Sequence, residues 1–132
     1  MSGKPNLPDD LQMKIKLRLQ SHVGAAQAMS KEDLAKAVLG EYNTTTDRQV
    51  REAISLLQNG RNKAGEEIPV ELIVSDLVKG GYFYVETDEE FSAYMADNES
   101  RINRLVEKRN AMNRAYWQKT KRKPNPMQER MF

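Results

Sequence analysis

Apolar residues recur at intervals of three and four in several parts of the chain, which is the spacing of amphipathic helices. The pattern is clearest in residues 46–59, where one side would carry Val50, Ala53, Ile54 and Leu57. Thr46 and Gln49 have the spacing of a capping box at a helix start, and Gly60 is a common type of helix stop. These signals together predict a helix with one buried side.

Three further helices are predicted by the same reasoning. A repeat of Leu and Ile indicates a helix over about residues 8–20, and Ser30 has the features of a cap that opens a second one. Thr87 and Glu90 form another capping box. The helix that they start has nothing to interrupt it before about Gln118.

Between these helices the pattern changes to that of strands. Residues 68–74 are rich in β-branched side chains and residues 81–85, GYFYV, are rich in aromatic ones, which predicts a β-hairpin. Pro69 cannot donate a hydrogen bond to a neighbouring strand, so it should lie at the start or the edge of its own strand. Residues 24–29 are expected to form a connection or a short turn. The sequence therefore predicts an α+β fold, a winged helix of three helices plus a β-hairpin wing, followed by a long C-terminal helix.

Three sequence runs in this region form a recognisable set: DRQVREAISLLQNG, a strand containing IVSD, and KGGYFYVETDEEFSAYM before a long charged helix. Together they resemble the small winged helix-turn-helix proteins of bacteriophages and prophages, over about residues 30–110. The resemblance implies a DNA-binding domain, here over residues 8–87, that acts in phage transcription regulation or as an origin-binding replication protein. The chain departs from that pattern in its longer, acidic loop between Gly60 and Ile68 and in its basic tail.

The polar side of the helix at residues 46–59 carries long hydrogen-bond donors. Such side chains donate to phosphates and to base edges in a DNA major groove. An ordinary amphipathic helix with a solvated polar side has the same pattern, but the hairpin that follows favours a helix-turn-helix unit. The candidate DNA contacts are Thr44, Thr45, Thr46, Arg48, Gln49, Arg51, Ser55 and Gln58 from this helix and the turn before it, with Arg61, Lys63 and Lys79 from the loop and the wing.

The long helix over residues 88–118 would carry an apolar stripe with alternating intervals of four and three, which is the heptad spacing of coiled coils. Asn98 and Arg109 interrupt this stripe. Either they fix the register of a dimer, or only the first turns of the helix pack on the domain and the rest is solvated. The residues predicted to form a homodimer are Phe91, Met95, Ile102, Leu105, Met112 and Tyr116.

The net charge of the 132 residues is only +2, but the charges are unevenly distributed. Residues 61–100 hold ten Asp and Glu against three Lys and Arg, whereas residues 101–132 hold ten Lys and Arg against two Asp and Glu. A basic end of this kind is attracted to polyanions, whether nucleic acid or acidic protein. Residues 1–7 and the basic tail at 119–132 are expected to be disordered.

Several kinds of chemistry are not expected. The chain has no Cys and one His, which argues against disulfides, thiol nucleophiles and zinc sites. It has no glycine-rich phosphate loop, and no residues are arranged for catalysis. We therefore expect no enzyme activity, no metal and no cofactor. No apolar run approaches the roughly 20 residues of a membrane span, and the start lacks the apolar block of a secretion signal. These features predict a protein without membrane association in the cytoplasm of a bacterial or phage-infected cell.

Two functions of different classes are consistent with the sequence. The first is sequence-specific binding of double-stranded DNA, with the helix at residues 46–59 in the major groove. The second is a winged-helix protein-interaction module that acts through the long helix on a phage or host protein and does not bind DNA. Surface charge discriminates them, since a continuous positive strip favours DNA and a strip interrupted by acids favours a protein partner. The cations concerned are Arg48, Arg51, Arg61 and Lys79, and the acids are Glu52, Glu66 and Glu67.

A third function, binding of single-stranded nucleic acid, would use the aromatic run Tyr82, Phe83 and Tyr84. Alternate residues of a strand point to opposite faces of a sheet. At least one or two of these rings are therefore expected in the core.

Overall fold

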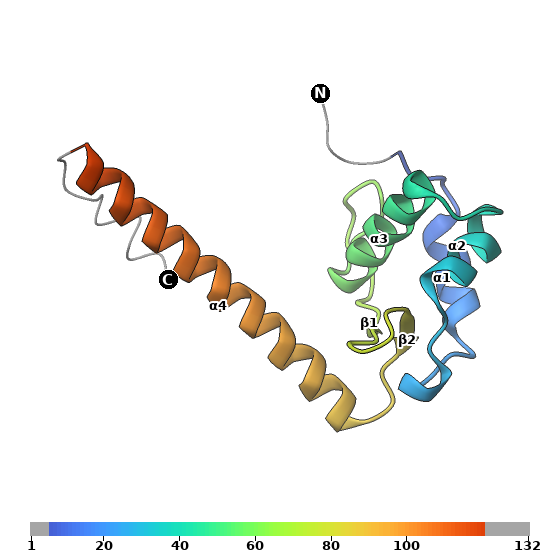
Figure 1. Ribbon diagram of the computed structural model, residues 1–132. Coiled ribbons are helices and arrows are strands. Elements are labelled where there is room, and N and C mark those ends of the chain that lie inside the picture. The colour runs from blue at the N-terminus through green and yellow to red at the C-terminus, as the bar shows by residue number, and fades with distance from the viewer. Residues whose placement is uncertain (1–5, 121–132) are drawn as a thin grey trace. The chain divides into compact units, whose positions relative to one another are not determined.

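The computed structural model describes residues 6–120, which form helices and one small antiparallel sheet. In chain order the elements are α1 (Leu11–Leu19), the 3-10 helix η1 (Ala25–Gln27), α2 (Lys31–Leu39), α3 (Thr44–Gln58), β1 (Ile73–Ser75), β2 (Tyr82–Tyr84) and α4 (Asp88–Lys119) (Figure 1). The predicted α+β class, with three helices, a hairpin and a long helix in that order, is confirmed. The chain divides into two compact units between Tyr94 and Met95, so the first turns of α4 belong to unit 1. None of the helices in residues 6–120 is long and apolar enough to cross a membrane.

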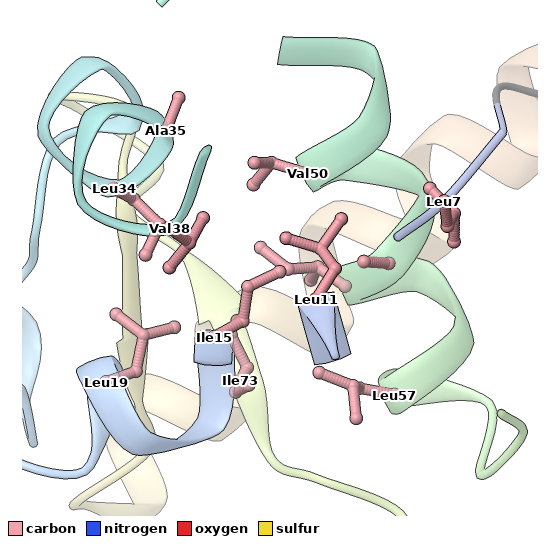
Figure 2. Close-up of a cluster of buried hydrophobic side chains, with 12 residues drawn as sticks. Leu7, Leu11, Ile15, Leu19, Leu34, Ala35, Val38, Val50, Leu57 and Ile73 are labelled. Atoms are coloured by element: carbon pink, nitrogen blue, oxygen red, sulfur yellow. The ribbon is translucent and has the colours of Figure 1, made fainter. Parts of the chain in front are cut away.

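The core of unit 1 is formed by the apolar sides of α1, α2 and α3 together with β1. Its buried side chains are Leu11, Ile15 and Leu19 from α1, Leu34, Ala35 and Val38 from α2, Val50, Ala53, Ile54 and Leu57 from α3, and Ile73 from β1 (Figure 2). The predicted apolar stripe of residues 46–59 is therefore the buried side of α3. Burial of this stripe fixes which side of α3 faces outward.

The core extends further towards the N-terminus than the sequence suggests. Leu7 is buried among the side chains of the helices. Two side chains also hold this segment, because Lys63 Nζ donates to the main-chain oxygen of Leu7 at 2.7 Å and Gln49 Nε2 donates to that of Asn6 at 2.8 Å. The expected disorder of residues 1–7 is thus wrong for Asn6 and Leu7, while residues 1–5 lie outside the described part of the chain.

The hairpin is shorter than predicted. β1 and β2 pair antiparallel, with Ile73 opposite Tyr84, Val74 opposite Phe83 and Ser75 opposite Tyr82. The predicted strand at residues 68–74 begins only at Ile73, because the preceding residues hydrogen-bond to the end of α3 instead. Ile68 N donates to Gly60 O at 2.9 Å, and Glu71 N donates to Leu57 O at 3.0 Å. This segment therefore attaches the hairpin to α3.

Both edges of β2 are paired. Opposite β1, Tyr84 N donates to His22 O and Gly24 N donates to Tyr84 O, while Met29 and Tyr82 exchange two main-chain hydrogen bonds of 2.9 Å. Residues 24–29 were expected to form a connection or a short turn. Together with His22 and Val23 they instead pair with β2 at two points, beside the edge that β1 leaves open. This segment links the end of α1 and the start of α2 to the hairpin.

The start of α4 is held by Glu90. Glu90 N donates to Thr87 Oγ1 at 3.2 Å and Thr87 N donates to Glu90 Oε1 at 3.3 Å, which confirms the predicted capping box. The same carboxylate also accepts from Glu86 N and, through Oε2, from Ala25 N, both at 2.8 Å. The hydrogen bond from Ala25, followed by that from Glu86, lowers the pKa of Glu90 below its ordinary value. The cap therefore also joins the first turn of α4 to η1.

This cap gives an expected pH dependence of stability. A carboxyl group whose pKa is lowered by folding stabilises the fold fully above its unfolded pKa, and the contribution is lost as the pH falls through the folded pKa. We expect Glu90→Gln to lower stability at pH 7 and to reduce the part of the stability that wild-type protein loses between pH 6 and pH 3. Urea titrations of both proteins at several pH values measure this effect. Glu89→Gln, in the same turn, is the control, and an identical pH profile for wild-type and Glu90→Gln protein would contradict the expectation.

Candidate nucleic-acid interface

The outward side of α3 carries a row of exposed polar residues. They lie three and four residues apart, which places them along one side of a helix. The row consists of Thr44, Arg48, Arg51 and Ser55. Half-buried Glu52 lies on the same part of the helix. Because Asp47 and Glu52 balance Arg48 and Arg51, α3 carries no net charge.

The first turn of α3 differs from the prediction. The helix begins at Thr44, and its cap is Asn43, whose Oδ1 accepts from Thr46 N at 2.9 Å while Asn43 N donates to Thr46 Oγ1 at 2.9 Å. Thr46 is therefore the inward partner of this capping box and is buried, which removes it from the candidate DNA contacts. Thr44 and Thr45 are exposed.

Arg51 forms an ion pair within α3. Its Nε lies 3.1 Å from Asp47 Oδ2, and its side chain remains 61% exposed. The charges of Asp47 and Arg51 both affect the pKa of Tyr82 in the hairpin. Burial raises the pKa of Tyr82, the Asp47 carboxylate raises it further, and the Arg51 guanidinium opposes this. Tyr82 therefore lies near enough to Asp47 and Arg51 for both charges to act on it.

Gln49 and Gln58 were predicted to contact DNA but are engaged within unit 1. Gln49 donates to the N-terminal segment, as described above. Gln58 Nε2 donates to Ile73 O at 2.7 Å and to Tyr94 Oη at 3.1 Å, so it ties α3 to both β1 and the start of α4. Gln58 is thus engaged in holding the fold together, and its contact with DNA stays a prediction.

The loop after α3 is also organised by internal contacts. Lys63 Nζ lies 2.7 Å from Leu7 O and 2.7 Å from Asp9 Oδ1, so this predicted phosphate contact has partners within unit 1. Its hydrogen bond and charge lower the pKa of Asp9. Arg61 is exposed, but its Nη1 lies 3.7 Å from Glu67 Oε1. The loop thus offers less positive charge than its sequence suggests.

The tip of the hairpin exposes Lys79 together with Val78, whose side chain is 91% exposed. Asp76 shapes this turn, since its Oδ1 accepts from Val78 N at 2.8 Å and from Lys79 N at 3.0 Å. These hydrogen bonds, that from Lys79 first, lower the pKa of Asp76. The apolar tip was not among the predicted site residues, and the Asp that precedes it is the sequence signal that could have placed the turn.

The aromatic run of β2 forms no exposed stacking surface. Phe83 is buried, and Tyr82 and Tyr84 are partly buried against the core. Tyr84 Oη donates to Glu71 Oε1 at 2.8 Å, and burial, with this hydrogen bond, raises the pKa of Tyr84. The expectation that the run supplies core residues is confirmed.

The predicted dimerisation residues are all exposed in the single chain. No residue of α4 is buried, and the apolar stripe is between 41% and 66% exposed. Its members are Phe91, Met95, Ile102, Leu105, Met112 and Tyr116. The helix continues to Lys119, so the predicted tail begins later than residue 119, and residues 121–132 of it lie outside the described part of the chain.

The predicted positive strip is interrupted by acids. Arg51 is paired with Asp47, Arg61 is near Glu67, and Glu52 lies beside Arg48 on α3. Within residues 6–120 no group of three or more His, Asp or Glu side chains is arranged to hold a metal ion. The chain matches no protein-family model, no curated protein and no solved structure with which it was compared.

Proposed function

We propose that this protein binds double-stranded DNA sequence-specifically, as a winged helix with α3 in the major groove and the β1–β2 hairpin as the wing. The observation that carries the proposal is the outward row Thr44, Arg48, Arg51 and Ser55, on a helix whose opposite side is fixed in the core. In a helix-turn-helix, the second helix enters the groove and its N-terminal residues meet the base edges.

The dimensions and flanks of α3 support this assignment. An α-helix with its side chains is about 10–12 Å across, which matches the roughly 12 Å width of the major groove, and the fifteen residues of α3 give it a length of about 22 Å. Gly40 to Asn43 form the short turn after α2. Lys79 is exposed at the hairpin tip, which supports the proposed contact of the wing with phosphates.

The charges around α3 set a condition on the proposal. Surface ion pairs within one helix contribute only about 0.3–0.5 kcal/mol, so Arg51 can exchange Asp47 for a phosphate or a base at little cost. General attraction to DNA must come from elsewhere, because α3 is neutral. Residues 101–119 of α4 hold six Lys and Arg against one Glu and can supply it, which would make binding dependent on salt.

We further propose a role in transcription regulation or origin-dependent replication of a phage or prophage, in the cytoplasm of the host cell. The support is the resemblance of the three sequence runs DRQVREAISLLQNG, IVSD and KGGYFYVETDEEFSAYM to such proteins. The structure places the first run largely on α3 and the second at β1.

Selection of bound duplexes from a random pool, at low and high salt, tests the DNA proposal directly. Sequence reading predicts one enriched motif at both salt concentrations, whereas general charge attraction predicts binding that disappears at high salt without enrichment. Absence of any enriched motif would overturn the proposal.

The selected duplex then allows a test of α3. Arg51→Ala is expected to weaken its binding by about 1–3 kcal/mol, because a good base contact has that value. Fluorescence anisotropy at fixed salt measures the change. Glu52→Gln should act in the opposite direction and strengthen binding a few-fold, since it removes a negative charge facing the phosphates.

Lys14→Ala is the matched control for Arg51→Ala. Lys14 also pairs with an Asp four residues before it, at 3.2 Å from Asp10, but on α1. Its loss therefore changes the net charge and breaks the same kind of pair away from α3. Equal effects of Arg51→Ala and Lys14→Ala would show that α3 does not read the duplex.

The second candidate function is a protein-interaction module that acts through α4. Two observations favour it: the acids beside Arg51 and Arg61, and the exposed apolar stripe of α4. If no duplex is enriched, the same purified protein would instead be expected to bind a helical protein partner of phage or host. Variants of the stripe, and not of α3, would then abolish that binding.

A further inference from the structure

The long helix α4 has an apolar side without a partner in the single chain. None of its 32 residues is buried. Helices in water gain most of their stability from packing of an apolar face, and this one is about 48 Å long at 1.5 Å per residue. A partner that covers this side would therefore stabilise the helix.

The order of residues along this side identifies the partner. Intervals of four and three alternate from Phe91 to Tyr116, and the polar residues Asn98 and Arg109 occupy two of the eight positions. Read from either end, the order is two apolar residues, one polar, two apolar, one polar and two apolar. A pattern that is the same in both directions is self-complementary when a second copy of the helix runs antiparallel to the first.

We propose that α4 pairs antiparallel with α4 of a second copy of this chain, in the register that places Asn98 opposite the second copy's Arg109. The same register places Ile102 opposite Leu105, Met95 opposite Met112, and Phe91 opposite Tyr116, each pair formed between the two copies. Every apolar residue then meets an apolar one. The dimer is symmetric, as a two-fold contact between identical surfaces requires.

The chemistry of the polar layer favours this register over a parallel one. A parallel, in-register pair would place two Arg109 guanidinium groups together in the interface, and like charges repel. In the antiparallel register each guanidinium meets the Asn98 side-chain oxygen, which accepts hydrogen bonds. Arg109 Nη2 donates to Asn110 Oδ1 at 2.9 Å within its own chain. Because a guanidinium has five N–H donors, this bond is compatible with a second one across the interface.

The residues beside the stripe are compatible with the pairing. In an antiparallel pair, Arg101 of one copy would approach Lys108 of the other, which is the one unfavourable contact. Arg101 is already paired with Asp97 of its own helix, with Nη2 and Oδ2 2.9 Å apart, which reduces the repulsion. On the other flank Glu99 would lie beside Val106. The inference does not depend on DNA binding by α3.

Disulfide cross-linking of the full chain tests the direction of the helices. The natural sequence has no Cys, so Met95→Cys and Met112→Cys each introduce a single thiol. In the antiparallel register, identical positions lie about 26 Å apart, which is far beyond the reach of a disulfide. We expect a covalent dimer when the two variants are mixed and oxidised, and none from either variant alone. The proposal would be overturned if each variant alone formed a covalent dimer, or if the mixture formed none.

A second variant tests the polar layer by the sign of its effect. Asn98→Asp would create two ion pairs with Arg109 per antiparallel dimer and should tighten self-association on the order of ten-fold. In a parallel dimer it would place two carboxylates together and weaken association. Asn103→Asp, on the exposed side of the same helix, adds the same charge as a control and should leave the dissociation constant unchanged. Sedimentation equilibrium measures both, and a weaker or unchanged Asn98→Asp dimer would contradict the antiparallel register.

Discussion

Leu57→Ala is expected to lower the free energy of unfolding by about 2–5 kcal/mol, the range for removal of a fully buried Leu side chain. Leu57 is 0% exposed and lies in the last turn of α3, on the side that faces the core. Its main-chain oxygen also accepts from Gly60 N and Glu71 N, so the cavity would form where α3 joins the segment leading to the hairpin. Urea denaturation followed by circular dichroism measures the loss.

Leu17→Ala provides the matched control for this experiment. The same side-chain atoms are removed from a helix, but Leu17 of α1 is 57% exposed. Leu17→Ala should therefore lower the free energy of unfolding by well under 1 kcal/mol, because surface substitutions usually change it by no more than about 0.5 kcal/mol. Comparable losses for Leu57→Ala and Leu17→Ala would mean that the apolar stripe of α3 is not the side that holds the helix. The outward placement of Arg48 and Arg51, and with it the DNA proposal, depends on that stripe.

The elements that the sequence predicted well are those specified by neighbouring residues. Ser30 caps α2 by accepting from Asp33 N at 3.1 Å, and Gly40 ends it with φ of +85°. Thr87 and Glu90 start α4 as expected. In each case the signal consists of residue types at a fixed short spacing, and no distant part of the chain competes with it.

The start of α3 shows how a local signal can be ambiguous. The run Asn43 to Thr46 offers four consecutive residues that can cap a helix. Two pairs have the capping-box spacing, Asn43 with Thr46 and Thr46 with Gln49. The structure uses the first pair, and Gln49 donates instead to Asn6, which is 43 residues away in sequence. A rule based on neighbouring residues cannot predict a hydrogen bond to such a distant residue.

The same limit explains why the sequence did not predict the internal hydrogen bonds of two candidate site residues. Lys63 and Gln58 have side chains of the types that commonly contact DNA, and the sequence placed them on the loop and the helix predicted to face it. Their actual partners, Asp9, Leu7, Ile73 and Tyr94, come from other elements that the fold brings close. By contrast, Arg48, Arg51 and Ser55 were correctly placed on the exposed side, because helical periodicity alone determines it. A residue's exposure was therefore more predictable than its hydrogen-bond partner.

Gly81→Ala is expected to destabilise the protein by about 3 kcal/mol or more, because a strained backbone and a steric conflict would add together. Gly81 has φ of +119°, and a Cβ atom there would lie 2.7 Å from Met29 O and 3.3 Å from Ser30 Cα. Both are main-chain atoms, so no side-chain rotation relieves the conflict. Met29 O is also the acceptor for Tyr82 N, and Ser30 is the cap of α2. The substitution would thus separate β2 from the start of α2.

Gly80→Ala separates the two causes. Gly80 also has positive φ, +73°, but a Cβ atom there would meet nothing within 4 Å. It should cost only the strain of a left-handed residue, about 1–2 kcal/mol. Urea denaturation of both variants at pH 7 measures the difference, and equal losses would show that β2 is not packed against Met29. If the difference is found, hydrogen exchange should show faster exchange of the Met29 and Tyr82 amides in Gly81→Ala than in Gly80→Ala. These two amides form one of the two main-chain links, the other being at Tyr84, that attach the hairpin to the segment between α1 and α2. Their protection therefore reports on whether this part of the hairpin is held in place.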